Sequence, residues 1–184
     1  RDESTGRLVS DDAVALWEAA GRRGELHRVC PQCVAAPLAP NLAARAESRA
    51  VDDELLCTGL DYWRERSDVV IVEGAGGLFS PLTDEKLNID LAAALGLPVV
   101  VVTANRLGTI HATLATLLAA RSYSPAPPIA GLVLNDATRD DGDASRKTNA
   151  AEIRRRTNVP ILATVGYGAT QCDVDWFALA EQCV

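Results

Sequence analysis

The sequence predicts an α/β protein with a parallel sheet between two layers of helices. Short, continuously apolar runs recur at 69–72, 99–102, 129–134 and 161–165. Strands that are covered on both faces are apolar throughout rather than alternating. Helical patterns follow or separate these runs at 88–95, 109–121 and 144–156, and they have the length that crossovers between parallel strands require. Repeated βαβ units of this kind predict a three-layer domain.

Three helices are expected before the first of these strands. Ser10 is an N-cap residue followed by two first-turn acids, and Gly21 ends the helical spacing behind it. Pro40 suits the first turn of a second helix. Apolar residues from Val51 to Trp63 recur at helical spacing and predict a third.

Length and charge exclude several classes of function. The chain has 184 residues, and we expect residues 1–184 to form a single domain. The formal net charge of -7 disfavours binding to nucleic acid or to an anionic membrane surface. No apolar run is long enough to span a bilayer and no secretion signal opens the chain, so we expect a cytoplasmic protein.

Cys30 and Cys33 form a Cys-x-x-Cys pair, but no second pair completes a zinc site.

The end of the first apolar run has the residues of a metal and phosphate site. Val72 leads into Glu73, and the next four residues are Gly74-Ala75-Gly76-Gly77. Ligands bind at the carboxyl ends of parallel strands, where a carboxylate is a hard oxygen ligand for Mg²⁺. Small residues let backbone N–H groups approach phosphate oxygens. The alternative, a glutamate before an ordinary glycine turn, is equally compatible with this motif alone.

Five segments, in the same order, give the chain a family resemblance. They are Ser10–Ala13, Pro37–Asn41, Val72–Asp84, Leu97–Ile110 and Gly131–Asp136. The third resembles the Val-Glu-Gly-Ala-Gly-Gly strand end and Pro-Leu-x-Asp of dethiobiotin synthetases, the fourth their Leu-Pro-Val strand and Leu-Gly-Thr-Ile turn, and the fifth their Gly-x-x-x-Asn-Asp strand end. Each match is weak alone, and the ordered set is specific.

The resemblance implies a sheet of P-loop NTPase type. Members of the family open with Gly-x-x-x-x-Gly-Lys-Thr, and this motif does not occur in the 184 residues. We therefore expect the first strand, the P-loop and the second strand to be missing, together with the lysines that the family uses in catalysis, so that no catalytic residue is assigned. Without its central strand, the fragment is expected to be inactive and prone to aggregate.

The resemblance also implies a reaction and a set of binding residues. The reaction is the ATP-dependent carboxylation and ring closure of 7,8-diaminopelargonic acid with CO₂, taken up as CO₂ or bicarbonate, to dethiobiotin. Asp12 and Glu73 would hold Mg²⁺, and Gly108, Thr109, Ile110 and His111 would bind the substrate carboxylate, in a homodimer. The residues implied in binding ATP are Asp12, Glu73, Gly74, Ala75, Gly76, Asn135, Asp136, Gly166, Tyr167 and Gly168.

Several departures from the family pattern leave alternatives open. His111 stands where the family has asparagine, and Gly166-Tyr167-Gly168 replaces a proline-containing adenine turn, which leaves the nucleotide preference open. Asp12 could be only a helix acid and Asn135 only an Asx-turn residue. The rival functions are a cobyrinate synthase-type P-loop enzyme and a non-catalytic scaffold that has lost its P-loop.

Overall fold

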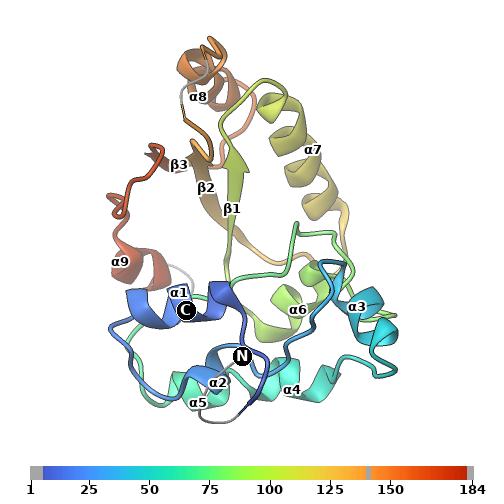
Figure 1. The fold of residues 1–184 in the computed structure, drawn as a ribbon. Coiled ribbons are helices and arrows are strands. Elements are labelled where there is room, and N and C mark those ends of the chain that lie inside the picture. The colour runs from blue at the N-terminus through green and yellow to red at the C-terminus, as the bar shows by residue number, and fades with distance from the viewer. Residues whose placement is uncertain (1–5, 140–141, 182–184) are drawn as a thin grey trace. The chain divides into compact units, whose positions relative to one another are not determined.

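The computed structural model describes residues 6–139 and 142–181. The chain divides into two compact units, Arg1–Leu91 and Ala92–Val184. The first unit is helical and irregular, and the second holds the parallel sheet (Figure 1). Each unit is described by itself below.

Short helices build the first unit. In chain order they are α1 (Asp11–Ala19), α2 (Leu26–Val29), α3 (Pro40–Ala46), α4 (Asp53–Thr58), α5 (Asp61–Arg64) and the first turn of α6 (Asn88–Leu95). The Ser10 hydroxyl accepts a hydrogen bond from the Ala13 N–H at 3.4 Å, and α3 begins at Pro40. Both predicted helix starts are therefore confirmed.

The helix expected over 51–63 is two helices in the structure. Asp52 caps α4 by accepting a hydrogen bond from the Leu55 N–H at 3.0 Å, and α4 ends at its C-cap residue Gly59. Glycine has the largest conformational entropy to lose in a helix, so it favours a break at this point. The helical spacing was correct on both sides of the glycine, but the prediction of one continuous helix was wrong.

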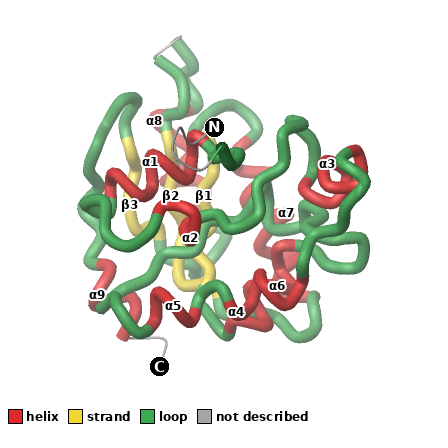
Figure 2. The backbone as a smooth tube through the Cα atoms, turned by 60° about the horizontal axis from the view of Figure 1, so that its bottom comes forward, coloured by secondary structure: helices red, strands yellow, loops and turns green. Residues whose placement is uncertain are grey.

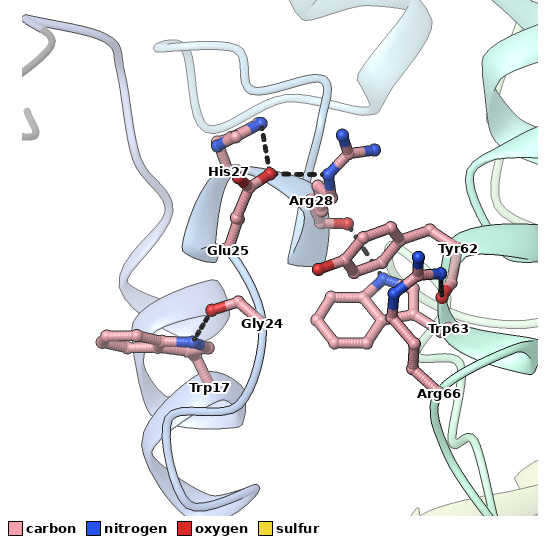
Figure 3. A network of polar contacts seen from close by, with 8 residues as sticks. All are labelled: Trp17, Gly24, Glu25, His27, Arg28, Tyr62, Trp63 and Arg66. Carbon is pink, nitrogen blue, oxygen red and sulfur yellow. Dashed lines mark hydrogen bonds and ion pairs between the residues drawn. The ribbon is translucent and has the colours of Figure 1, made fainter.

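Aromatic and cationic side chains pack α2 against α5 in this unit (Figure 3). The guanidinium carbons of Arg28 and Arg66 lie 4.3 and 4.4 Å from the centre of the Tyr62 ring. The Trp63 indole N–H donates to the Arg28 carbonyl oxygen at 3.3 Å. A Cβ atom on Gly24 would lie 2.9 Å from the Trp63 ring, so the close approach of this loop requires glycine.

The apolar run at 69–72, which we expected to be a buried strand, is irregular in the structure. Ile71 exposes 65% and Val72 45% of its surface. No strand pairs with this segment within the described residues, and extended backbone needs a neighbour to satisfy its N–H and C=O groups. The prediction of a strand here was wrong because an apolar pattern indicates a tendency to be buried but does not supply a pairing partner.

The second unit contains a parallel sheet with the strand order β1-β2-β3 (Figure 2). The strands are β1 (Val99–Ala104), β2 (Ile129–Asn135) and β3 (Ile161–Val165), and the helices are α7 (Thr109–Ser122), α8 (Arg146–Arg154) and α9 (Trp176–Glu181). Ala104 pairs with Asn135, and Asn135 pairs with Val165. The predicted α/β class, its parallel sheet and three of the predicted strands are confirmed.

The core of the second unit lies between β2 and two helices. Leu132 and Leu134 are fully buried on one face of β2, since alternate residues of a strand point to the same side. Leu117 of α7 and Ile153 of α8 pack against them. Both crossover helices therefore cover the same face of the sheet.

One contact within the sheet requires a glycine. A Cβ atom on Gly131 of β2 would lie 2.5 Å from Cγ of Leu162 on β3. Real Cβ atoms do not approach other atoms so closely, so the leucine occupies space that any other residue at 131 would need.

In the part of the chain that the structure describes, none of the helices is both long enough and apolar enough to cross a membrane.

Candidate functional site

A buried asparagine holds the glycine-rich loop after Glu73 by hydrogen bonds to its backbone carbonyl groups. Asn88, at the start of α6, is only 7% exposed. Its side-chain Nδ2 donates to the carbonyl oxygens of Ala75 at 2.9 Å and Gly77 at 3.0 Å. Its backbone N–H donates to the carbonyl oxygen of Ser80 at 3.2 Å. One residue therefore fixes three carbonyl groups of the loop.

Two glycines of this loop have close neighbours. Gly76 has a φ of +84°, and a Cβ atom there would lie 2.8 Å from the Ser80 Oγ. A Cβ atom on Gly74 would lie 3.1 Å from the Asn88 Oδ1. The Ser80 Oγ also accepts a hydrogen bond from the Gly77 N–H at 3.0 Å. The glycine pattern is thus required by the way the loop folds onto Ser80 and Asn88.

The loop is exposed and has free backbone donors. The residues from Glu73 to Gly77 are exposed, and within the described residues the N–H groups of Gly74, Ala75 and Gly76 have no hydrogen-bond acceptor. Successive free N–H groups form a concave anion-binding surface. Because the carbonyl groups of residues 75 and 77 are turned toward Asn88, the loop can offer donors to an anion without presenting those acceptors.

The predicted metal ligands Asp12 and Glu73 both lie in the first unit and are exposed. Asp12 is in the first turn of α1. Burial raises the pKa of the Cys30 thiol to about 12, with smaller contributions from Cys33 and from the charge of Asp12. No cluster of three or more His, Cys, Asp and Glu side chains occurs among the residues described. The high pKa keeps the Cys30 sulfur protonated, which disfavours a reactive or metal-binding thiolate.

The second unit brings the ends of its three strands together. The Asn105 N–H donates to the Asn135 carbonyl at 2.8 Å, and the Asp136 N–H donates to the Val165 carbonyl at 2.8 Å. These bonds extend the parallel ladder beyond the strands. The predicted nucleotide residues Asn135 and Asp136 therefore lie beside Gly166, Tyr167 and Gly168 at one edge of the sheet, where the Tyr167 side chain is 55% exposed.

Two buried asparagines that the sequence did not indicate lie behind this edge. Asn105, 4% exposed, donates from Nδ2 to the Asp136 Oδ1 at 2.9 Å. Asn149 of α8, 1% exposed, donates to the Asn105 Oδ1 at 3.0 Å. Asn105 follows an apolar run of the sequence, as Glu73 and Asn135 do, and the strand-end rule would have found it. Asn149 resembles an ordinary polar residue of an exposed helix, and no sequence signal identifies it.

The start of α7 has two free backbone donors. Gly108 caps the helix with a φ of 95°. The Thr109 N–H donates to the Arg106 carbonyl at 3.1 Å, and its hydroxyl lies 2.8 Å from the Thr103 hydroxyl. Among the residues described, the N–H groups of Ile110 and His111 have no acceptor. Of the four predicted substrate residues, these two therefore offer N–H groups, Gly108 shapes the turn, and Thr109 is committed to internal bonds.

Comparisons with known proteins agree with the resemblance found in the motifs. A family model described as "AAA domain" matches residues 2–170. The "ATP-dependent dethiobiotin synthetase BioD" of Rhodopirellula baltica is 41% identical over 170 residues, which are 87% of this chain and 65% of the relative. The protein of the same name in Anaeromyxobacter dehalogenans strain 2CP-C is 47% identical over 83% of this chain and 67% of its own length.

A third relative of that name, from Aromatoleum aromaticum, is 36% identical over 89% of this chain and 71% of its own length. The chain thus spans 65–71% of the length of these three relatives. The family model and the parallel sheet together support a fold of P-loop NTPase type. By motifs, fold and identity, the chain belongs to the dethiobiotin synthetase family.

Proposed function

We propose that this chain belongs to an enzyme that uses ATP to carboxylate 7,8-diaminopelargonic acid and close its ureido ring, giving dethiobiotin, ADP and phosphate. The observation that carries the proposal is the loop after Glu73. Asn88 holds two of its carbonyl groups, and three successive N–H groups of this exposed loop have no acceptor within the described residues. Family membership gives this anion-binding surface its substrate, the phosphates of ATP.

The carboxylates Asp12 and Glu73 fit a magnesium ion. Both are exposed, and neither has a hydrogen-bonding or ionic partner through its carboxylate within the described residues. Mg²⁺ keeps several water molecules and takes one or two protein carboxylates together with substrate phosphates, so it does not need a larger acidic cluster. When bound, the ion would neutralise charge that develops on the transferred phosphoryl group. Asp12 and Glu73 would hold it.

The strand ends of the second unit would bind the nucleotide base. The Asn135 side-chain amide has no partner in the described part of the chain, so a donor and an acceptor are both available to the edge of an adenine ring. Asp136 is fixed by Asn105, and the 166–168 turn lies beside it. Base recognition would therefore depend on Asn135, Asp136 and the 166–168 turn, whose positions the sheet fixes in the absence of ligand.

The start of α7 would bind the substrate carboxylate. The free N–H groups of Ile110 and His111 and the positive end of the helix dipole favour a negative charge there. We propose, from the family, that this end serves a neighbouring subunit in a homodimer and that the protein is cytoplasmic. The His111 side chain is exposed.

The experiment is a turnover assay on the protein expressed from the whole of its gene. We expect release of phosphate from ATP that requires Mg²⁺, bicarbonate and 7,8-diaminopelargonic acid together. ATP hydrolysis stimulated instead by glutamine and a corrinoid acid would support a cobyrinate synthase-type enzyme. Absence of ATP binding in calorimetry would support a scaffold and overturn the proposal.

A further inference from the structure

Asn149 is a buried polar residue in the middle of α8. Its side chain is 1% exposed, and Ile153, one turn further along α8, is fully buried in the core. A buried amide without hydrogen bonds destabilises the folded protein. The Asn149 Nδ2 avoids this cost by donating to the Asn105 Oδ1 at 3.0 Å and to the Arg106 carbonyl at 3.2 Å.

The hydrogen bond from Asn149 fixes the orientation of the Asn105 amide, which in turn contacts Asp136 at the end of β2. Because its Oδ1 accepts from Asn149, its Nδ2 must point the other way, and it donates to the Asp136 Oδ1 at 2.9 Å. A flipped Asn105 would place its carbonyl oxygen against the Asp136 carboxylate and its amide nitrogen against that of Asn149. The donor on Asn149 therefore selects the orientation in which Asp136 is held.

The same segment of chain also holds the loop that leads into α7. Asp143 accepts a hydrogen bond from the Leu107 N–H at 2.7 Å and one from the Ser145 N–H at 2.9 Å. Asn149 binds the preceding carbonyl, that of Arg106. The C=O and the N–H of the peptide group between Arg106 and Leu107 are thus both tied to residues 143–149, directly before the Gly108 cap. Figure 1 shows α8 beyond the carboxyl ends of β1 and β2.

We propose that Asn149 is a positioning residue for both binding ends of the second unit. Its side chain orients Asp136 through Asn105, and it fixes the Arg106–Gly108 loop that places the free N–H groups of α7. The proposal rests on the proposed function, in which these two ends bind nucleotide and substrate carboxylate. Asn149 itself touches neither ligand.

The test compares two variants on adjacent residues of α8 in the protein expressed from its whole gene. Asn149→Ala removes these two donations and a longer contact with the Ser145 Oγ at 3.4 Å. Thr148→Ala is the matched control, because the Thr148 side chain is exposed and its hydroxyl bonds only the Ser145 carbonyl at 3.1 Å. We expect Asn149→Ala to raise the KM for both ATP and the diamino acid by about tenfold, as the loss of one or two buried hydrogen bonds implies. The control is expected to change neither.

A second pair of measurements separates positioning from stability. Asn105→Ala should raise the KM for ATP, and the double variant should be no worse for ATP than the more affected single variant, since both act through Asp136. Hydrogen exchange at the Leu107 N–H should become faster in Asn149→Ala. A variant with a lower melting temperature but unchanged KM values and unchanged exchange at Leu107 would overturn the proposal.

The remaining outcomes are also decisive. If Asn149→Ala does not fold, Asn149→Ser, which keeps a short donor, and Asn105→Ala take its place in the same assays. If the wild-type protein binds ATP but does not consume the diamino acid, the proposed function fails. The positioning role is then judged from the dissociation constant for ATP and from exchange at Leu107, and unchanged values in the variants refute it.

Discussion

The side-chain amide nitrogen of Asn88 lies 3.0 Å from the carbonyl oxygen of Gly77 and 2.9 Å from that of Ala75, so one buried side chain sets the direction of the loop after Glu73. Its Oδ1 is buried without a partner among the described residues. The amide orientation is nevertheless fixed, because only nitrogen can donate to carbonyl oxygens.

This relationship predicts a difference between two substitutions of Asn88. Asn88→Ala removes the donations and should lower the free energy of unfolding by about 1–3 kcal/mol. Asn88→Asp should be worse, because a carboxylate would face two carbonyl oxygens at close range. Urea unfolding measures both, with the exposed Asn158→Ala as control. Equal stability of Asn88→Asp and wild type would mean that the loop does not depend on this donor.

Gly76 and Gly77 are neighbours that should respond differently to alanine. Gly76 has a φ of +84°, and a Cβ atom there would lie 2.8 Å from the Ser80 Oγ. Gly77 has only an ordinary contact, 3.8 Å from the same oxygen. Gly76→Ala should therefore lose about 1–2 kcal/mol of stability and weaken ATP binding, whereas Gly77→Ala should be tolerated. Calorimetric titration with ATP and thermal melting of both variants check this, and a reversed order would contradict the loop geometry.

Glu73→Gln tests the proposed metal ligand. The side chain is exposed and has no partner within the described residues, so its neutral isostere should leave the melting temperature unchanged. Loss of a charged oxygen ligand should reduce turnover about a hundredfold or more, with a raised requirement for Mg²⁺. The control is Glu85→Gln, which alters another exposed glutamate. Wild-type activity of Glu73→Gln would show that Glu73 is only a turn residue.

The Asp143 carboxylate predicts a pH dependence of stability. Its pKa is lowered from 3.8, first by the side-chain hydrogen bond of Ser145 and then by the backbone N–H groups of Leu107 and Ser145. A lowered folded-state pKa gives stability that is present above 3.8 and lost as the pH falls through the folded value. The difference in melting temperature between wild type and Asp143→Asn should therefore shrink on acidification below 3.8. The exposed Asp68→Asn is the control, and a difference that is constant with pH would refute the effect.

The strands that the sequence predicted correctly are those with neighbours. Residues 99–102, 129–134 and 161–165 pair with one another in parallel, and their apolar pattern was sufficient because the sheet buries them against α7 and α8. The run at 69–72 has the same composition, but it lacks a partner within the described residues and remains irregular. Pairing is a long-range property, which a local pattern cannot encode.

Candidate site residues could be chosen from the sequence where they lie at the end of an apolar run or at the start of a helical pattern. Glu73, Asn135 and the cap Gly108 each follow an apolar run or precede a helical one, so position alone indicated them. Asn88 and Asn149 lie at the start and in the middle of helices, and their importance comes from carbonyl groups brought to them by distant segments. For Thr109, the sequence could not show that its hydroxyl and N–H are hydrogen-bonded inside the unit.

The contact between Gly131 and Leu162 makes these two positions interdependent over evolutionary time. The leucine of β3 fills the space above a residue of β2 that has no side chain, so a larger residue at 131 becomes acceptable only after 162 has become smaller. The intermediate with both side chains large would be overpacked, and the one with both small would leave a cavity. Either route passes through a less stable protein, so the pair should be inherited together as a unit of two residues.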